Sequence, residues 1–361
     1  MAITLQIWYK MAVSSHNDWD PLLEVFVGRA DTTMCPPKDI STHSFCYGGS
    51  PYSVVEKLPE HYDQKILEEA SEDLDTLSHT LENLGIKVHR PDHIDNSKSF
   101  STPEWESRGW TQYSPRDLLL PLDNLIIETP SPMRSRYFET RAYYKYLYEQ
   151  MQDGTEWISA PKPLLTDDNY KLGTPEDVTL NNKEIIFDAP NVVRLGTDIL
   201  AQISNSGNHL GFKWLQTILE PRGYKIHTAE KFYSYSHFDS TILPLRPGLV
   251  LFNSDRLSPD RYPDIFKSWD KIWFGGDQLK VSPHHMPNGV SPTSTAIGLN
   301  FLSVNPNLVI CDVVQDELRK TLAKHGIETI GLPMRHARTL SGGFHCVTLD
   351  VKRKGSLESY F

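Results

Sequence analysis

Ser341-Gly342-Gly343-Phe344-His345-Cys346, near the C-terminus, is followed by Val-Thr-Leu-Asp-Val at 347–351, an alternating run that predicts a strand. Two adjacent glycines let a backbone approach a neighbour closely or adopt a positive φ angle. A thiol held where such a loop meets a strand is a candidate nucleophile. The alternative is that Cys346 packs in the core, because free cysteine is also a small hydrophobe. This stretch alone leaves both interpretations open.

Composition indicates a large globular protein from a reducing compartment. The chain has 361 residues, of which 39% are apolar and 11% aromatic, enough for a sizeable core. Its four cysteines are too few and too irregularly spaced for a disulfide framework. They form no Cys-x-x-Cys pair, which argues against a zinc site built on thiolates.

The charge balance bears on the partners. The formal net charge is −10 and no run of five basic residues occurs, which argues against a nucleic-acid partner. An acidic surface suits a cationic substrate. Residues 3–8 are mildly apolar and followed by Lys10, without the basic start and long apolar core of a signal peptide. No window approaches the roughly 20 apolar residues of a membrane span, so we expect a cytoplasmic protein without a membrane partner.

Periodicity and turn residues predict alternating strands and helices. The predicted helices cover 62–84 and 137–148, and residues 29–60, rich in Pro, Gly, Ser and Thr, predict a long surface loop. The predicted strands, several of which run into Asp or Asn, are 22–28, 86–89, 124–128, 182–187, 248–252 and 307–311. Cys311 lies inside the last of these and is expected to be a core residue.

A helix–glycine–strand unit occurs around Gly85, Gly223 and Gly326. The spacing is too irregular for a short-period solenoid, so the recurrence indicates a βα module repeated around one architecture. Chance similarity remains an alternative, because glycine is the usual residue after a helix C-terminus. We expect one α/β domain over 1–361.

A nucleophilic cysteine needs a base and a carboxylate that orients the base. His237 and Asp239 are two residues apart, so in a strand both would face the same side. The alternative is an ordinary surface histidine. His345, next to Cys346, would point to the opposite face of a strand and is expected not to be its base.

Two further carboxylates and one arginine are candidates for substrate recognition. Asp117 and Asp188 lie at the ends of predicted elements, where they could hold a planar cation through paired hydrogen bonds; each could instead be a turn residue. Arg256 could bind a substrate carboxylate or form a surface ion pair.

Together these residues resemble the arginine-dependent amidinotransferases, a family with members in creatine, streptomycin and cyanobacterial toxin synthesis. The resemblance extends from about residue 17 to 355. Its motifs are Pro115-Arg116-Asp117, Ala160-Pro161-Lys162-Pro163, Phe187-Asp188-Ala189, Asp198-Ile199-Leu200-Ala201-Gln202, His237-x-Asp239, Asn253-x-Asp255-Arg256 and Gly342-Gly343-Phe344-His345-Cys346.

The resemblance implies a pentein-like α/β-propeller, in which about five ββαβ modules surround a central channel, and a homodimer. It implies amidino transfer from L-arginine to a primary amine, with release of L-ornithine through an amidino-Cys346 intermediate and with no metal or other cofactor. The family's general acid/base falls on His237. Its guanidinium-binding carboxylates fall on Asp117, Asp188 and Asp239, and Arg256 would meet the arginine α-carboxylate.

Two departures from the family bear on the acceptor. Ser234 and Ser236 replace an Asn and a Met of the glycine-specific enzyme, which leaves room for a bulkier acceptor, such as a saxitoxin-type amino ketone. Asn191 replaces an Asp, which puts a charge-based contact there in doubt. The alternatives are an arginine deiminase-type hydrolase, which yields citrulline and ammonia, and a non-catalytic arginine-binding relative.

Overall fold

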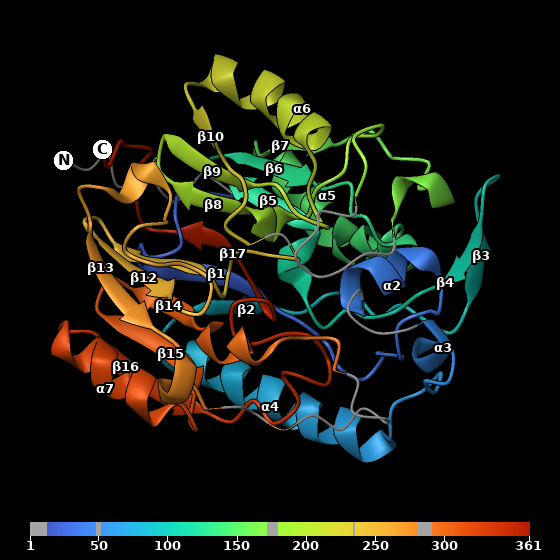
Figure 1. The fold of residues 1–361 in the computed structure, drawn as a ribbon, viewed down its shortest axis with the longest axis horizontal. Helices are drawn as coiled ribbons and strands as arrows, with labels where there is room; N and C mark the ends of the chain where they lie inside the picture. The colour runs from blue at the N-terminus through green and yellow to red at the C-terminus, as the bar shows by residue number, and fades with distance from the viewer. Residues whose placement is uncertain (1–12, 48–51, 172–179, 234, 281–282, 284–290) are drawn as a thin grey trace.

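The computed structural model describes residues 13–47, 52–171, 180–233, 235–280, 283 and 291–361. In these ranges the strands form five three-stranded sheets and one two-stranded sheet, with α4, α6 and α7 on the outside of the molecule (Figure 1). The helices are α2 (Ile40–Cys46), α3 (Tyr52–Val55), α4 (Gln64–Asn83), α5 (Tyr144–Gln152), α6 (His209–Leu219) and α7 (Asp316–Lys324). The strands are β1 (Leu22–Val27), β2 (Lys87–His89), β3 (Ser99–Ser101), β4 (Glu106–Arg108), β5 (Leu119–Leu122), β6 (Leu125–Glu128), β7 (Glu156–Ser159), β8 (Val192–Leu195), β9 (Asp198–Gln202), β10 (Lys225–Ala229), β11 (Ile242–Arg246), β12 (Leu249–Asn253), β13 (Asp270–Phe274), β14 (Leu302–Asn305), β15 (Leu308–Asp312), β16 (Glu328–Leu332) and β17 (Thr348–Arg353).

The three-stranded sheets share one plan. Two antiparallel strands are followed by a helical connection and a third strand parallel to the second, as in β8–β9–α6–β10. The sheets β5–β6–β7, β11–β12–β13 and β14–β15–β16 repeat this pattern, although only a short 3₁₀ turn at Asp264–Phe266 connects β12 to β13. In the fifth sheet, β17 pairs antiparallel with β1, and β2 runs parallel to β1. Because β1 and β17 come from opposite ends of the described chain, this pairing closes the ring and confirms the predicted α/β-propeller of ββαβ modules.

A glycine follows each of the helices α4, α5, α6 and α7 and marks the repeat. Gly85, Gly223 and Gly326 have φ angles of 80°, 88° and 73°, in the left-handed region that glycine adopts without steric cost. Gly154, between α5 and β7, has a φ of 103° and completes a fourth unit that the sequence analysis missed. The recurring helix–glycine–strand unit is therefore a structural module and not a coincidence of helix caps.

Two predicted elements are wrong. Residues 29–60 are not simply a surface loop, because Asp39 accepts hydrogen bonds from the backbone of Ser41 and Thr42 and begins the largely buried helix α2. Residues 182–187 do not form a strand. The Asn208 side chain donates to the Asn181 and Glu184 carbonyls, which satisfies backbone groups that a sheet would otherwise use.

Most of the remaining predictions hold with small shifts. The helix over 62–84 is α4, and the strands near 22, 86, 124, 248, 307 and 347 are β1, β2, β6, β12, β15 and β17. The aromatic helix begins as a 3₁₀ segment at Glu139–Tyr143 and continues as α5. Cys311 is fully buried in an apolar cluster, as predicted. None of the helices in the described ranges is long and apolar enough to cross a membrane.

A buried carboxylate on β17 joins several modules. Asp350 accepts hydrogen bonds from Arg353 Nε at 2.6 Å and from Arg194 Nη2 of β8 at 2.8 Å. Arg116, next to the motif residue Asp117, donates to its other oxygen. All four side chains are buried, so Asp350 supplies each arginine with an anionic partner where the strands converge. Asp350, Arg353, Arg194 and Arg116 form an arginine–aspartate cluster with Asp18, which also pairs with Arg194.

Removing the charge of this cluster should destabilise the fold. Asp350→Asn leaves three buried guanidinium groups short of a counter-charge, and we expect the free energy of unfolding to fall by about 3 kcal/mol or more. Urea denaturation measures the change. Asp264→Asn, which breaks an exposed ion pair with Lys267, is the matched control and should leave stability nearly unchanged. Equal effects of the two substitutions would contradict the role of Asp350.

Candidate active site

The glycines before Cys346 allow the backbone to lie close to neighbouring side chains. A Cβ added to Gly343 would lie 2.8 Å from Asn300 Cβ, and one added to Gly342 would lie 2.9 Å from Ser114 Oγ. The positive φ in this loop, 63°, belongs to Ser341. Asn300 can therefore accept a hydrogen bond from the Cys346 backbone N–H, at 2.9 Å from its Oδ1. Cys346 therefore lies in this loop, two residues before β17 begins at Thr348.

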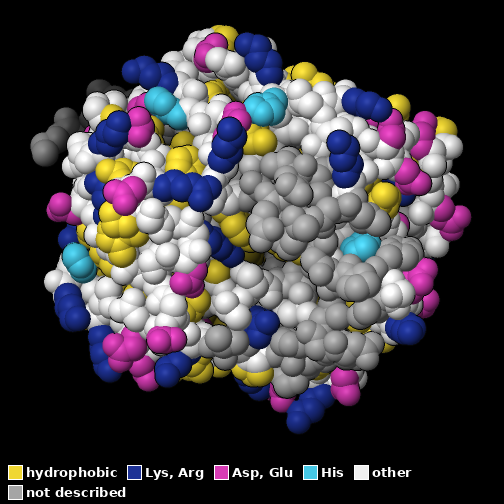
Figure 2. Space-filling view, in the orientation of Figure 1, with side chains coloured by type: hydrophobic (Ala, Val, Ile, Leu, Met, Phe, Trp, Pro, Cys, Tyr) yellow, Lys and Arg dark blue, Asp and Glu magenta, His cyan; other side chains and the backbone are white. Residues whose placement is uncertain are grey.

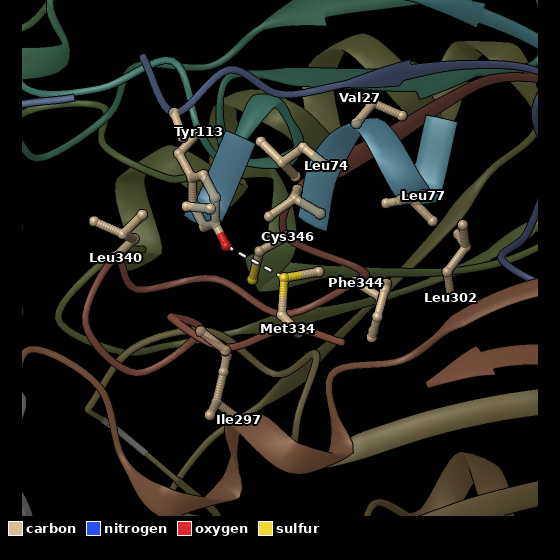
Figure 3. Packing of buried hydrophobic residues seen from close by; sticks show 14 of the residues in the cluster. Val27, Leu74, Leu77, Tyr113, Ile297, Leu302, Met334, Leu340, Phe344 and Cys346 are labelled. Carbon is tan, nitrogen blue, oxygen red and sulfur yellow. Dashed lines mark hydrogen bonds between the residues drawn. The ribbon is translucent and has the colours of Figure 1, made fainter. Parts of the chain in front are cut away.

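The Cys346 side chain has an apolar side and an acidic side. Figure 3 shows it among the buried residues Tyr113, Met334 and Phe344. Its Sγ lies 3.2 Å from Oδ2 of Asp239, to which the thiol donates. Burial, followed by the negative charges of Asp239 and Asp117, raises the pKa of the thiol well above its ordinary value. In the free protein, Cys346 is a protonated thiol near neutral pH.

His237 lies between two carboxylates. Its Nε2 is 3.0 Å from Asp188 Oδ2, its Nδ1 is 3.7 Å from Asp117 Oδ1, and the Phe45 ring packs against it at 5.4 Å. Burial alone would lower the pKa of His237, but the charge of Asp117 and the hydrogen bond that His237 donates to Asp188 outweigh burial and raise it to about 9. His237 is therefore an imidazolium at neutral pH and can donate a proton.

The structure changes two of the predicted pairings. His237 and Asp239 do not lie on one face of a strand, because residues 237–239 form no strand, and the ring of His237 meets Asp188 and Asp117. His345 does not point away from the cysteine. Since β17 begins only at Thr348, strand alternation does not apply, and His345 Nδ1 lies 3.0 Å from the same Asp239 oxygen that faces Cys346.

Arg136 is a buried site residue that the sequence analysis missed. It donates to Asp117 Oδ2 and forms a bidentate pair with Glu139, at 2.7 and 2.8 Å. Oδ1 of Asp117 is left facing His237 without a hydrogen bond. Arg136 lies outside the recognised motifs, and its only sequence signal was an arginine within an aromatic segment, which is too common to single out.

Arg256 is held by hydroxyl groups. Its Nη1 donates to Thr241 Oγ1 at 2.6 Å and its Nη2 to Ser294 Oγ at 2.8 Å, while its guanidinium stacks over Tyr233 at 3.7 Å. Among the described residues it makes no ion pair with a carboxylate, so its charge is available to an anionic group of a ligand. The surface ion pair considered from the sequence is not formed there.

Two hollows share Arg256 in their linings. An inner pocket of about 60 Å³ is lined by Asp117, Ser236, His237, Asp239 and Cys346, among others. An outer cleft of about 1070 Å³ shares Tyr233, Tyr235 and Arg256 with it. The inner pocket admits a small planar group and the outer cleft a larger molecule. Over the face in Figure 2, acidic and basic side chains are interspersed.

The remaining candidates are placed as follows. Ser236 lines the inner pocket, whereas Ser234 lies outside the described residues. Asn191 is fully buried, with its side-chain amide 3.0 Å from Gln202 and 2.8 Å from Ser204, and it does not line either hollow. Within the described ranges, no group of three or more His, Cys, Asp and Glu side chains is arranged to hold a metal ion.

Removing the Asp239 charge should make Cys346 more reactive towards a small alkylating reagent. Because the Asp239 carboxylate raises the thiol pKa, Asp239→Asn should increase the rate of iodoacetamide labelling of Cys346 at pH 7.5. Peptide mass spectrometry locates the label, and Asp264→Asn is the control. An unchanged or slower rate in D239N would contradict this account of the thiol.

Wild-type stability should also depend on the charge of His237. Because folding raises the pKa of His237 from 6.5 to about 9, its charged form stabilises the fold. This contribution to the free energy of unfolding is complete below about pH 6.5 and is lost as the pH rises towards 9. The stability difference between wild type and His237→Gln, measured by urea unfolding from pH 6 to 9.5, should therefore shrink with rising pH. A difference that stays constant or grows would contradict a cationic His237.

Known proteins resemble this chain over nearly its whole length. The inosamine-phosphate amidinotransferase structure from Streptomyces griseus is 43% identical, covers 96% of this chain and 99% of its own, and superposes with a TM-score of 0.91. The amidinotransferase SxtG from Microseira wollei, in the saxitoxin biosynthetic pathway, is 37% identical, covers 97% and 100%, and gives a TM-score of 0.85.

The L-arginine:L-lysine amidinotransferase of Pseudomonas savastanoi pv. phaseolicola is 34% identical and is matched over 96% of each chain. No family model matches the sequence. Identity at this level over almost all of both chains, together with a shared fold, shows common descent. The chain belongs to the amidinotransferases.

Proposed function

We propose that this amidinotransferase moves the amidino group of L-arginine to a primary amine and releases L-ornithine, by way of an amidino-thioether on Cys346. The observation that carries the proposal is that one small pocket presents the Cys346 thiol, the cationic His237 and the carboxylates of Asp117 and Asp239. A nucleophile, an acid and two anionic groups are what the cleavage of a guanidinium ion needs.

The residues divide the work of binding arginine. Asp117 and Asp239 line the inner pocket and would hold the planar guanidinium by charge-assisted hydrogen bonds. Asp188 does not line the pocket; it orients His237 through Nε2. Arg256, at the junction with the outer cleft, would bind the α-carboxylate. The polar ends of arginine would then be held at opposite ends of the inner pocket.

The proton balance of the reaction follows from the charge states. The Cys346 thiol, hydrogen-bonded to the ionised Asp239 Oδ2, releases its proton to solvent as the sulfur adds to the guanidinium carbon. The bond from that carbon to the side-chain nitrogen breaks, and His237 gives its proton to the departing nitrogen of ornithine. In the second half, an amine adds to the amidino carbon and loses a proton to the now neutral His237. The carbon–sulfur bond then breaks, and the thiolate takes up a proton from solvent.

Two classes of acceptor are candidates. A saxitoxin-type amino ketone fits the room beside Ser236 and the likeness to SxtG. A phosphorylated amino-cyclitol is favoured by the basic residues Lys231, Arg261 and Arg338, which line the outer cleft and would attract a phosphate group. The inosamine-phosphate enzyme is also more similar in sequence. In both cases the acceptor is larger than glycine.

The domain organisation, oligomeric state and location of the protein are part of the same proposal. We propose that residues 1–361 act as one domain, as a homodimer in the cytoplasm. The support for one domain is the β1–β17 pairing that closes the ring, and for the dimer and location it is the family resemblance. The runner-up activity, a deiminase that lets water attack the amidino-thioether, would use the same cysteine. A non-catalytic arginine-binding protein would not need the thiol.

An arginine-dependent screen tests the function. The protein is incubated with L-arginine and a panel of amines (lysine, glycine, an amino-cyclitol phosphate and an amino ketone), and ornithine, citrulline and the amidinated products are quantified. Ornithine in equal amount to one amidinated amine supports the proposal. Citrulline and ammonia formed without an amine would support the hydrolase, and no turnover of arginine would support a binding protein.

The covalent intermediate predicts exchange without an acceptor. Arginine and isotope-labelled ornithine, incubated with the enzyme alone, should yield labelled arginine, because the first half-reaction runs in both directions. Cys346→Ala should abolish this exchange, whereas His227→Gln, outside the site on β10, should leave it unchanged. Exchange that persists in C346A, or that requires the acceptor, would contradict the ping-pong scheme.

A further inference from the structure

His345 is a second imidazole beside the nucleophile, and none of the steps above uses it. Its Nδ1 lies 3.0 Å from Asp239 Oδ2, the oxygen that accepts the Cys346 thiol hydrogen at 3.2 Å. His345 itself does not line the inner pocket, whereas Asp239 does. The imidazole therefore reaches the reacting atoms only through Asp239.

The partners of the ring determine where its hydrogen lies. Burial raises the pKa of Asp239, but the hydrogen bond and charge of His345, with the charge of His237, outweigh burial and hold it below its ordinary value. An ionised carboxylate can only accept hydrogen bonds, so His345 Nδ1 must carry the hydrogen that it shares with Asp239. The other ring nitrogen, Nε2, faces Asp18 Oδ1 at 3.9 Å.

The far side of His345 is anchored to the fold. Asp18 pairs with Arg194 of the arginine–aspartate cluster, and Arg116 of the same cluster donates to the His345 carbonyl at 3.3 Å. A rear cavity of about 30 Å³, about the volume of one water molecule, is lined by Asp18, Asp239 and His345. Asp239 thus separates the substrate pocket from a rear chamber in which His345 is held.

We propose that His345 is a positioning residue of the amidino transfer, whose Nδ1–H fixes Asp239 in its ionised form with Oδ2 on the Cys346 thiol. The proposal rests on the proposed function, since it assigns His345 a part in the first half-reaction. Without this donor, Asp239 is a buried carboxyl group that can turn away from the sulfur or take up a proton. It could then neither accept the thiol hydrogen nor hold the guanidinium.

Two substitutions separate the donor from the bulk of the side chain. The amide nitrogen of Asn can occupy the position of Nδ1, whereas the longer Gln places its amide near Nε2, so H345N keeps the donor and H345Q loses it. We expect kcat for ornithine release to fall about 10- to 100-fold in H345Q, the cost of a misplaced catalytic group, and to recover to within about 5-fold of wild type in H345N. The His227→Gln variant, at a partly exposed His–Asp pair, controls for the substitution itself.

The pH profile is the second measurement. Asp239 must be ionised, so the acid limb of kcat/KM should move to higher pH in H345Q and stay near wild type in H345N. The charged groups near Asp239 and His345 that remain, His237, Asp18, Arg194, Arg116 and Arg256, are the same in both variants. A shift confined to H345Q therefore reports the lost donor.

The outcomes are distinct. Loss in H345Q with recovery in H345N and a shifted acid limb supports the proposal. If kcat falls equally in both variants, in step with their melting temperatures, His345 only packs and the proposal is overturned. An H345Q variant with the kcat of wild type also overturns it. If wild-type protein releases no ornithine from arginine, the proposed function itself has failed, which the wild-type assay reports before any variant is made.

Discussion

The buried pairing of Asp350 with three arginines is the interaction on which the rest of the structure depends. It brings together β8, β17 and the segment before β5, at the point where the ends of the described chain meet and close the ring. The same cluster holds the loop that carries Cys346. Arg116 Nε donates to the carbonyls of His345 at 3.3 Å and Thr348 at 2.8 Å, so the backbone on either side of Cys346 is fixed by groups that also close the fold.

A deficit of positive charge prepares the site for its substrate. Asp117, Asp188 and Asp239 lie around one cationic histidine and the Cys346 thiol, whose pKa is raised in part by Asp239 and Asp117. A bound guanidinium ion would supply the missing cation and lower the cost of forming the thiolate. The nucleophile would then be activated by the molecule that it attacks, which protects it from other reagents while the pocket is empty.

Much of the fold and most of the site could be predicted from the sequence. The glycines after α4, α6 and α7 and the apolar strands are local signals, so three of the modules could be predicted without their arrangement in space. The order of the motifs identified Cys346, His237, Asp117, Asp188 and Asp239, all of which the structure brings to one place. Which of these side chains contact one another could be predicted only in part. The strand assumed at 237–239 paired His237 with the wrong aspartate, because a loop obeys no alternation.

The residues that were missed act through contacts distant in the sequence. Arg136 lies 19 positions from its partner Asp117, and Asp18 lies 327 positions from its partner His345. Neither Arg136 nor Asp18 lies in a recognised motif. His345 was set aside on the alternation of side chains in a strand, which does not apply because β17 begins only at Thr348. Burial and tertiary hydrogen bonds, which the sequence does not display, decide the role of all three.

The central claim is that Cys346 carries the amidino group between donor and acceptor. Its most direct test is the mass of the peptide containing Cys346 after the protein is mixed with arginine alone, quenched in acid and digested. The account predicts a mass increase of one CN₂H₂ unit on Cys346, which disappears when an accepted amine is added before quenching. An unmodified Cys346 peptide in a sample that has released ornithine would contradict it.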